Sequence, residues 1–194
     1  MIGAPVFTII AGINGAGKTS LYHVLKESKH LGDRINIDEL AKEEGDWRDP
    51  LVQIHAGRTA MARIAEYIQA GRSFHMETTL PGTAIVKQIR EAKEYGFMVC
   101  LYFVGIDDVK LAIERVHQRM ARGGHGIGDK FIVKRYDQLN QNLRRILPLC
   151  DVAILFDNTV KFRQIAILEK KRLIDCDRDL PDWFIDLIDD WSDE

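Results

Sequence analysis

The sequence predicts an α/β fold, with a mostly parallel sheet of five or six strands and helices on both faces. Short apolar segments alternate with longer amphipathic segments, and this alternation is typical of parallel strands joined by helices. The segment Phe97–Val104 is apolar at nearly every position, as expected of a strand that is buried on both faces. At 194 residues the chain suits one domain, 1–194, with a single core.

Five apolar segments are predicted as strands. They are Val6–Ala11, Arg34–Ile37, Ser73–Thr79, Phe97–Val104 and Val152–Phe156. The second strand is expected to end at Asp38, and Pro81 with Gly82 breaks the third. A sixth strand can form at Gln164–Glu169.

Helices are predicted between these strands. The helix that begins at Pro50 and ends at Gly71 carries an apolar stripe, which predicts a buried face: Leu51, Ile54, Met61, Ile64 and Ile68. The region 105–147 is predicted to hold two helices with a glycine-rich turn between them, and Asp107 or Asp108 caps the first. The second helix is expected to pack through Ile132, Tyr136, Leu139, Leu143 and Ile146.

The charge of the chain is unevenly distributed. The segment 175–194 holds nine acidic residues and one arginine, a net charge of −8, so the rest carries +6 within a total of −2. A weakly basic body without a block of Lys or Arg suits a small anionic ligand and does not indicate a nucleic-acid partner. Trp183, Leu187 and Trp191 share one helical face, which predicts that this acidic C-terminal helix packs on the body.

The composition also bears on the compartment. No apolar run approaches the ~20 residues that a membrane helix needs, and the N-terminus lacks the basic start of a secretory signal. The three cysteines have no metal-type spacing, and Cys100 and Cys150 lie among apolar neighbours. We therefore expect a cytoplasmic protein without a membrane partner.

The segment from Gly12 to Thr19 matches G-x-x-x-x-G-K-[ST], with a predicted strand before it and a helix after it. Glycines at these positions let backbone N–H groups turn toward one anion, and the start of the helix adds its partial positive charge. The rival dinucleotide motif G-x-G-x-x-G fails because position 14 is Asn. The sequence therefore predicts a site for a nucleoside triphosphate, ATP with Mg²⁺, in which Lys18 contacts phosphate and Thr19 binds the metal. The residues expected to bind the nucleotide are Gly12, Asn14, Gly15, Ala16, Gly17, Lys18, Thr19 and Ser20.

Two carboxylates follow predicted strands. Asp38 comes at the end of the second strand, where it can accept the proton of an acceptor hydroxyl; alternatively, it merely caps a following helix. Glu77 comes at the end of the third strand, with Thr79 close behind. These two residues can contact a substrate hydroxyl or a water on Mg²⁺, unless they only mark an exposed strand end.

Arginines gather around the glycine-rich turn. Arg115, Arg119 and Arg122 form a ridge along one helix, and Arg135 lies on the next. Arg122 and Arg135 bracket the turn, so they could close on a transferring phosphoryl group, with His125 as a contact to the substrate. The alternative is a set of ordinary solvated arginines.

The segments GINGAGKTS, NIDE, METT and RMARGGHGIGDKFIVKRY together resemble the zeta toxin family of P-loop kinases, especially its small stand-alone bacterial members. The resemblance covers roughly Val6 to Asn158 and implies the P-loop NTPase fold. It also implies transfer of phosphate from ATP to the 3′-hydroxyl of UDP-N-acetylglucosamine, and an antitoxin as protein partner. This sequence has Gly128 where the family often has Pro, which can loosen the turn.

The resemblance assigns roles to particular residues. It implies that Asp38 is the base, that Lys18 contacts phosphate, and that Arg122 and Arg135 hold the triphosphate. Glu77 and Thr79 match the motif that contacts the substrate. Two other functions stay open: a P-loop kinase of another small hydroxylated metabolite, and a nucleotide-dependent switch or ATPase that acts through a protein partner.

Overall fold

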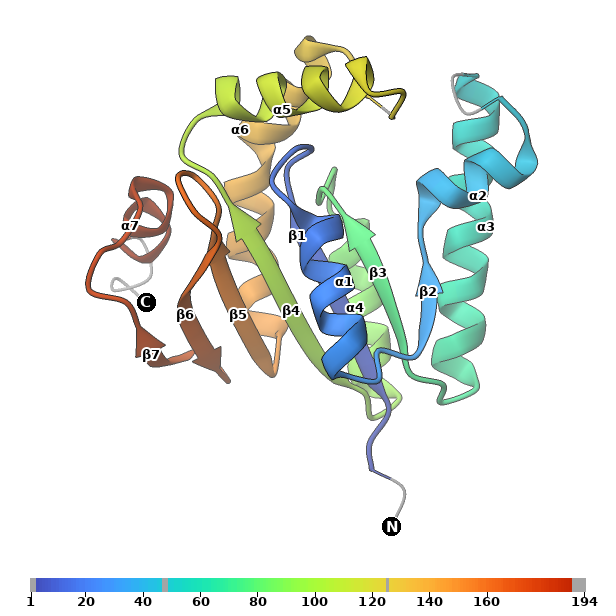
Figure 1. Cartoon of the computed structure of the whole chain (residues 1–194). Coiled ribbons are helices and arrows are strands. Elements are labelled where there is room, and N and C mark those ends of the chain that lie inside the picture. The colour runs from blue at the N-terminus through green and yellow to red at the C-terminus, as the bar shows by residue number, and fades with distance from the viewer. Residues whose placement is uncertain (1–2, 47–48, 125, 190–194) are drawn as a thin grey trace.

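Seven strands form one sheet in the computed structural model, which describes residues 3–46, 49–124 and 126–189. The strand order is β2-β3-β1-β4-β5-β6-β7, and the first five strands of that order are parallel (Figure 1). The strands are β1 (Val6–Gly12), β2 (Asp33–Ile35), β3 (Phe74–Thr78), β4 (Met98–Gly105), β5 (Val152–Asp157), β6 (Arg163–Glu169) and β7 (Arg172–Cys176). The predicted α/β class with a mostly parallel sheet is confirmed.

Helices cover both faces of the sheet, as predicted. Helix α1 lies in front of the sheet in Figure 1, whereas α4 and α6 lie behind it and α5 crosses the end of the strands. The helices are α1 (Lys18–Ser28), α2 (Ile37–Glu44), α3 (Pro50–Gln69), α4 (Ala84–Glu94), α5 (Val109–Ala121), α6 (Asp129–Ile146) and α7 (Asp182–Asp189), with a short 3₁₀ turn η1 (Leu147–Leu149). Within the described ranges, no helix combines the length and apolar character that a membrane span requires.

Strand β1 is the central one of the five parallel strands and fixes the position of the glycine-rich turn. It pairs in parallel with β3 and with β4, and its side chains Phe7, Ile9 and Ile10 are fully buried. In register, Ile10 lies beside Glu77 on one side, and Gly12 lies beside Val104 on the other. The carboxyl ends of β1, β3 and β4 therefore meet at one edge of the sheet, where ligands of open α/β sheets bind.

The edge of the sheet differs from the prediction. The expected sixth strand is present as β6. A seventh strand, β7, was not predicted because its sequence has no strong apolar pattern. Leu173 and Ile174 of β7 are both exposed, since this strand pairs only with β6 at the antiparallel edge. An edge strand with little burial carries a weak apolar signal, which explains why the sequence pattern did not predict it.

The apolar stripe that was predicted for α3 is only partly buried. Ile64 and Ile68 are in the core, but Leu51, Ile54 and Met61 are exposed. The other buried positions are Ala56 and Ala60, whose small side chains allow close packing. In Figure 1 the N-terminal half of α3 extends beyond β2 beside α2, so its large apolar residues have no sheet to cover them.

Helix α7 packs on the body through aromatic residues. Trp183, Phe184 and Leu187 are buried, which confirms this part of the predicted packing; Trp191 lies outside the described residues. The predicted helical segment 175–194 begins too early: Asp175 and Cys176 belong to β7, and the helix begins only at Asp182. The Trp183 ring lies 5.3 Å from that of Phe103, and its indole N–H donates to the buried carboxylate of Asp157 at 3.2 Å.

Replacing Trp183 with alanine is expected to lower the free energy of unfolding by about 3–5 kcal/mol, because it leaves a cavity and removes a donor from a buried carboxylate. Urea denaturation followed by circular dichroism measures this loss. Tyr95, which is 53% exposed, provides the control: Tyr95→Ala is expected to cost less than about 1 kcal/mol. Equal losses in the two variants would contradict the packing of α7 on the core.

Candidate active site

A cleft of about 470 Å³ lies at the edge of the sheet where β1 and β3 end. The turn after β1, the start of α2, the end of β3 and the helices α5 and α6 all contribute to its walls. The residues that line it are Asn14, Gly15, Gly17, Lys18, Thr19, Ser20, Asn36, Ile37, Asp38, Gln53, Glu77, Thr78, Thr79, Pro81, Arg115, Arg119 and Arg135. Segments that are far apart in the sequence thus form one polar site.

The turn between β1 and α1 requires its glycines. Gly12, Gly15 and Gly17 have φ angles of +148°, +83° and +109°, which side chains rarely allow. A Cβ atom at Gly12 would lie 2.4 Å from the carbonyl oxygen of Val104, and one at Gly15 would lie 2.7 Å from that of Ala112. Helix α1 begins directly after Gly17 and has no side-chain cap, so its first N–H groups face the cleft without a competing side-chain acceptor.

Lys18 lies over this turn. Its ammonium donates to the carbonyl oxygens of Gly12 at 2.9 Å and Ile13 at 3.0 Å. Burial lowers the pKa of Lys18 to about 8, although the negative charges of Glu77 and Asp38 oppose the shift. A cation held by neutral carbonyls near two carboxylates is ready to bind an anion.

Glu77 and Thr19 face each other across the cleft. The Thr19 hydroxyl donates to Oε2 of Glu77 at 3.4 Å, and Oε1 of Glu77 accepts from Arg34 at 2.5 Å. The Glu77 side chain is only 8% exposed. Glu77 is the penultimate residue of β3, close to the strand end where it was predicted, and Thr79 lines the cleft just beyond that strand.

Asp38 lines the cleft, as expected of a site residue. The predicted strand Arg34–Ile37, however, extends two residues too far at its C-terminal end. Strand β2 stops at Ile35, and Asp38 lies in the first turn of α2. The alternative, that Asp38 caps this helix, is also wrong: the side chain of Asn36 accepts from the N–H groups of Asp38 and Glu39 at 3.0 and 3.4 Å. Asn followed by acidic residues is a helix-start pattern, and it was present in the sequence.

The structure brings three arginines to the cleft. Arg115 and Arg119, one turn apart on α5, line the cleft together with Arg135 of α6. Arg135 donates to the side chain of Asn14 at 3.0 Å, and burial lowers its pKa from the usual value. Arg115 donates to the carbonyl oxygen of Asn158 at 2.8 Å, which ties α5 to the loop after β5.

Four predicted site residues are not among those that line the cleft. Gly12 and Ala16 are buried within the glycine-rich turn itself. Arg122 is exposed at the C-terminal end of α5, beyond the turn that carries Arg119, and it does not line the cleft. Its contact with a triphosphate stays a prediction. His125 lies outside the described residues.

Sequence reasoning missed Arg34 and Asn158. Arg34 holds Glu77, and Asn158 donates to the carbonyl oxygen of Ala16 at 2.7 Å, so it supports the glycine-rich turn from the side. Neither residue belongs to a motif. A basic residue next to a short buried strand gives no signal until its partners are known.

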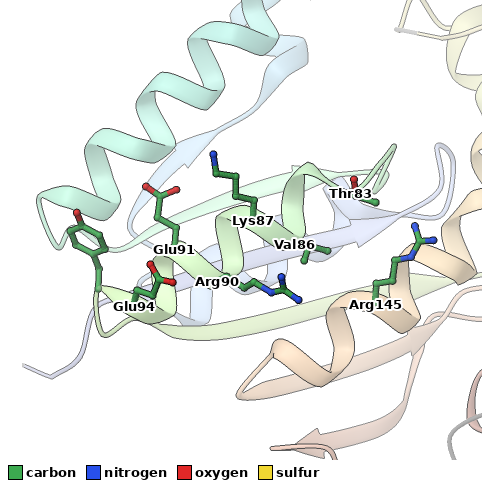
Figure 2. Close-up of a pocket in the computed structure, with 8 residues that line it drawn as sticks. Thr83, Val86, Lys87, Arg90, Glu91, Glu94 and Arg145 are labelled. Atoms are coloured by element: carbon green, nitrogen blue, oxygen red, sulfur yellow. The ribbon is translucent and has the colours of Figure 1, made fainter.

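A second hollow of about 880 Å³ lies on the outer surface of α4. Figure 2 shows that its side chains project from α4, with Arg145 added from α6. Its charged residues are of mixed sign, and none of the described site residues lines it: Thr83, Val86, Lys87, Arg90, Glu91, Glu94, Tyr95 and Arg145. The chemistry is therefore assigned to the smaller cleft, which holds the anion-binding turn.

Comparison with known families shows to which family the chain belongs. The model of the zeta toxin family matches residues 2–172. The chain belongs to the zeta toxin family. It is accordingly a P-loop phosphotransferase that binds nucleotides, and the resemblance seen in the sequence is confirmed.

Individual relatives of this zeta toxin family member share between 16% and 33% of their aligned residues with it. An uncharacterized protein of Haemophilus influenzae is 33% identical over 125 residues, which cover 64% of this chain and 88% of that protein. A structure from the PezAT chromosomal toxin–antitoxin system of Streptococcus pneumoniae has a TM-score of 0.60 at 17% identity, over 96% of this chain and 77% of that chain.

Two further structures share the fold over part of their own length. AvrRxo1-ORF1:ORF2 with ATP has a TM-score of 0.61 at 16% identity, over 87% of this chain and 60% of that chain. A chain of the Pnkp1/Rnl/Hen1 RNA repair complex has a TM-score of 0.58 at 18% identity, over 73% of this chain. The present chain spans 46% of that chain. At these identities the comparisons establish the fold of the zeta toxin family member and no more.

The pKa of Lys18 leads to a test of the nucleotide site. Only the ammonium form attracts phosphate oxygens, so the affinity for a nucleoside triphosphate is expected to fall as the pH rises through 8. The expected loss is about fivefold between pH 8 and pH 9. Titration with a fluorescent nucleoside triphosphate measures it. In Lys18→Arg, which stays charged, the affinity is expected to be constant over this range; a parallel fall in both proteins would rule out Lys18 as the titrating group.

Proposed function

We propose that the protein transfers the γ-phosphoryl group of ATP to a hydroxyl of a sugar nucleotide, with UDP-N-acetylglucosamine as the acceptor. The observation that carries this proposal is the grouping of Lys18, Thr19, Asp38 and Glu77 with three arginines in one cleft. Phosphoryl transfer needs an anion-binding turn, a residue that orients the acceptor, and cations for the developing charge. The family supplies the expected acceptor.

The triphosphate would bind at the start of α1. The glycine-rich turn and the uncapped N-terminus of the helix offer N–H donors, and Lys18 can exchange its two carbonyl acceptors for phosphate oxygens. The structural neighbour AvrRxo1 was determined with ATP, which supports ATP as the donor. Thr19 and Ser20 follow Lys18 in the lining of the cleft.

The residues of the cleft fit a magnesium ion. The hydroxyl of Thr19 and the carboxylate of Glu77 lie 3.4 Å apart, and both are oxygen ligands of the kind that Mg²⁺ prefers. No group of three or more His, Cys, Asp or Glu side chains that could hold a metal occurs among the described residues. In phosphate-transferring sites Mg²⁺ is usually held by one or two carboxylates together with the phosphates of the substrate. The ion, when bound, would neutralise charge on the phosphates.

Asp38 would act as the base. The acceptor hydroxyl attacks the γ-phosphorus, the bond from that phosphorus to the β,γ-bridging oxygen breaks, and ADP leaves. The proton of the hydroxyl passes to the carboxylate of Asp38. Arg115, Arg119 and Arg135 would stabilise the charge on the transferring group, and Thr79 would contact the acceptor.

A smaller acceptor is the second candidate. A volume of about 470 Å³ is within the range for one small ligand, and ATP would occupy much of it. This observation favours a kinase of a small hydroxylated metabolite.

A protein partner also fits the proposal, since the matched Streptococcus pneumoniae structure comes from a toxin–antitoxin system.

Transfer from γ-labelled ATP to a panel of hydroxylated metabolites, led by UDP-N-acetylglucosamine, tests the proposed acceptor. Asp38→Asn is expected to lower the rate by about 100-fold or more, because the variant cannot accept the proton. Glu43→Gln changes an exposed carboxylate on the same helix and is expected to keep the full rate.

Three other results would change the proposal. Label on a different metabolite would show that this metabolite, and not UDP-N-acetylglucosamine, is the acceptor. Equal rates for Asp38→Asn and the parent protein would remove Asp38 as the base. Nucleotide binding without any labelled product would favour a nucleotide-dependent switch.

A further inference from the structure

We propose that Arg34 is a positioning residue: it holds the carboxylate of Glu77 against Thr19 and joins the three elements that carry the reacting groups. This proposal rests on the proposed function of the cleft. Arg34 itself does not line the cleft, so any effect it has on the reaction acts through the residues it contacts.

The Arg34 guanidinium makes three contacts from β2. One nitrogen donates to Oε1 of Glu77 and another to Oε1 of Glu39, both at 2.5 Å. Its central carbon lies 4.2 Å from the centroid of the Tyr22 ring. The Arg34 side chain is 25% exposed, so these contacts are partly shielded from water.

These contacts reach all three elements that supply the proposed reacting groups. Tyr22 belongs to α1, the helix that begins with Lys18 and Thr19. Glu39 follows Asp38 in the first turn of α2, and Glu77 lies near the end of β3. One guanidinium therefore sets the spacing between the helix after the anion-binding turn, the turn that carries the base, and the strand that carries the buried carboxylate.

The contact with Arg34 also gives the two carboxylate oxygens of Glu77 different partners. Oε1 accepts from Arg34, and Oε2 is left to accept from the Thr19 hydroxyl. Without Arg34, a carboxylate that is 8% exposed would lose its countercharge, and its side chain would turn toward another donor or toward water. The oxygen that faces Thr19 would then no longer be fixed where a cation binds.

The geometry requires arginine. A planar guanidinium can donate to two carboxylates in its plane while its face covers an aromatic ring. A lysine at this position keeps the charge but has a single nitrogen, so it cannot maintain both carboxylates and the ring contact together. The Tyr22 ring also stacks on the buried His75, which helps to hold it in place.

The test compares Arg34→Gln and Arg34→Lys with Arg72→Gln as a matched control. Arg72 also pairs with a carboxylate, that of Asp33, and lies over a tyrosine ring, that of Tyr67, but it contacts none of the proposed site residues. Binding of ATP is measured by calorimetry with Mg²⁺ and with EDTA, and turnover is measured against Mg²⁺ concentration.

In both Arg34 variants we expect ATP affinity in EDTA to stay within about twofold of the parent, because the glycine-rich turn is intact. The gain in affinity on adding Mg²⁺ is expected to fall about tenfold, the usual effect of removing a residue that orients a metal ligand. The Mg²⁺ concentration for half-maximal turnover is expected to rise by a similar factor. Arg72→Gln is expected to keep the full response to Mg²⁺.

A full response to Mg²⁺ in Arg34→Gln and Arg34→Lys would overturn the proposal, even if both variants were less stable. If Arg34→Gln does not fold, Glu39→Gln provides a milder test, because it removes one of the two carboxylates that hold Arg34. A parent protein that shows the Mg²⁺ gain but phosphorylates nothing would refute the proposed function alone. Loss of the gain in the Arg34 variants would still support the positioning role.

Discussion

The site depends on the close contact between the turn after β1 and the backbone of β4 and α5. Gly12 and Gly15 lie so near the carbonyl oxygens of Val104 and Ala112 that no side chain fits at either position. This contact fixes the start of α1 at the edge of the sheet, directed at the cleft. The proposed roles of Glu77 and Asp38, which line the same cleft from neighbouring elements, depend on this fixed start.

Features with a local physical cause could be predicted from the sequence. The buried strand Phe97–Val104 is apolar because both of its faces are covered, and the glycine-rich turn has a motif because its backbone cannot tolerate side chains. The packing seam of α6 was equally clear, since Ile132, Leu139 and Leu143 recur at helical spacing and are buried. The family and the type of reaction follow from these same segments.

Features that depend on tertiary contacts could not be predicted. The end of β2 was placed too late because Asn36 starts a helix there. Which arginines of α5 line the cleft depends on where the helix ends: Arg115 and Arg119 line it and Arg122 does not, although the contact of Arg122 with a triphosphate stays a prediction. Arg34 belongs to no sequence motif, because its proposed role depends on a contact with Glu77, which lies 43 residues away in the chain. The exposure of Leu51 on α3 could not be predicted either, because it depends on whether the sheet covers that part of the helix.

We propose above all that this cleft moves a phosphoryl group from a nucleotide to a hydroxyl. The most direct measurement is ³¹P NMR of the protein with ATP, Mg²⁺ and UDP-N-acetylglucosamine. We expect a new phosphomonoester signal that grows in equal amount with ADP, without inorganic phosphate. Inorganic phosphate that grows with ADP in place of that signal would contradict phosphoryl transfer to a hydroxyl and identify the protein as an ATPase.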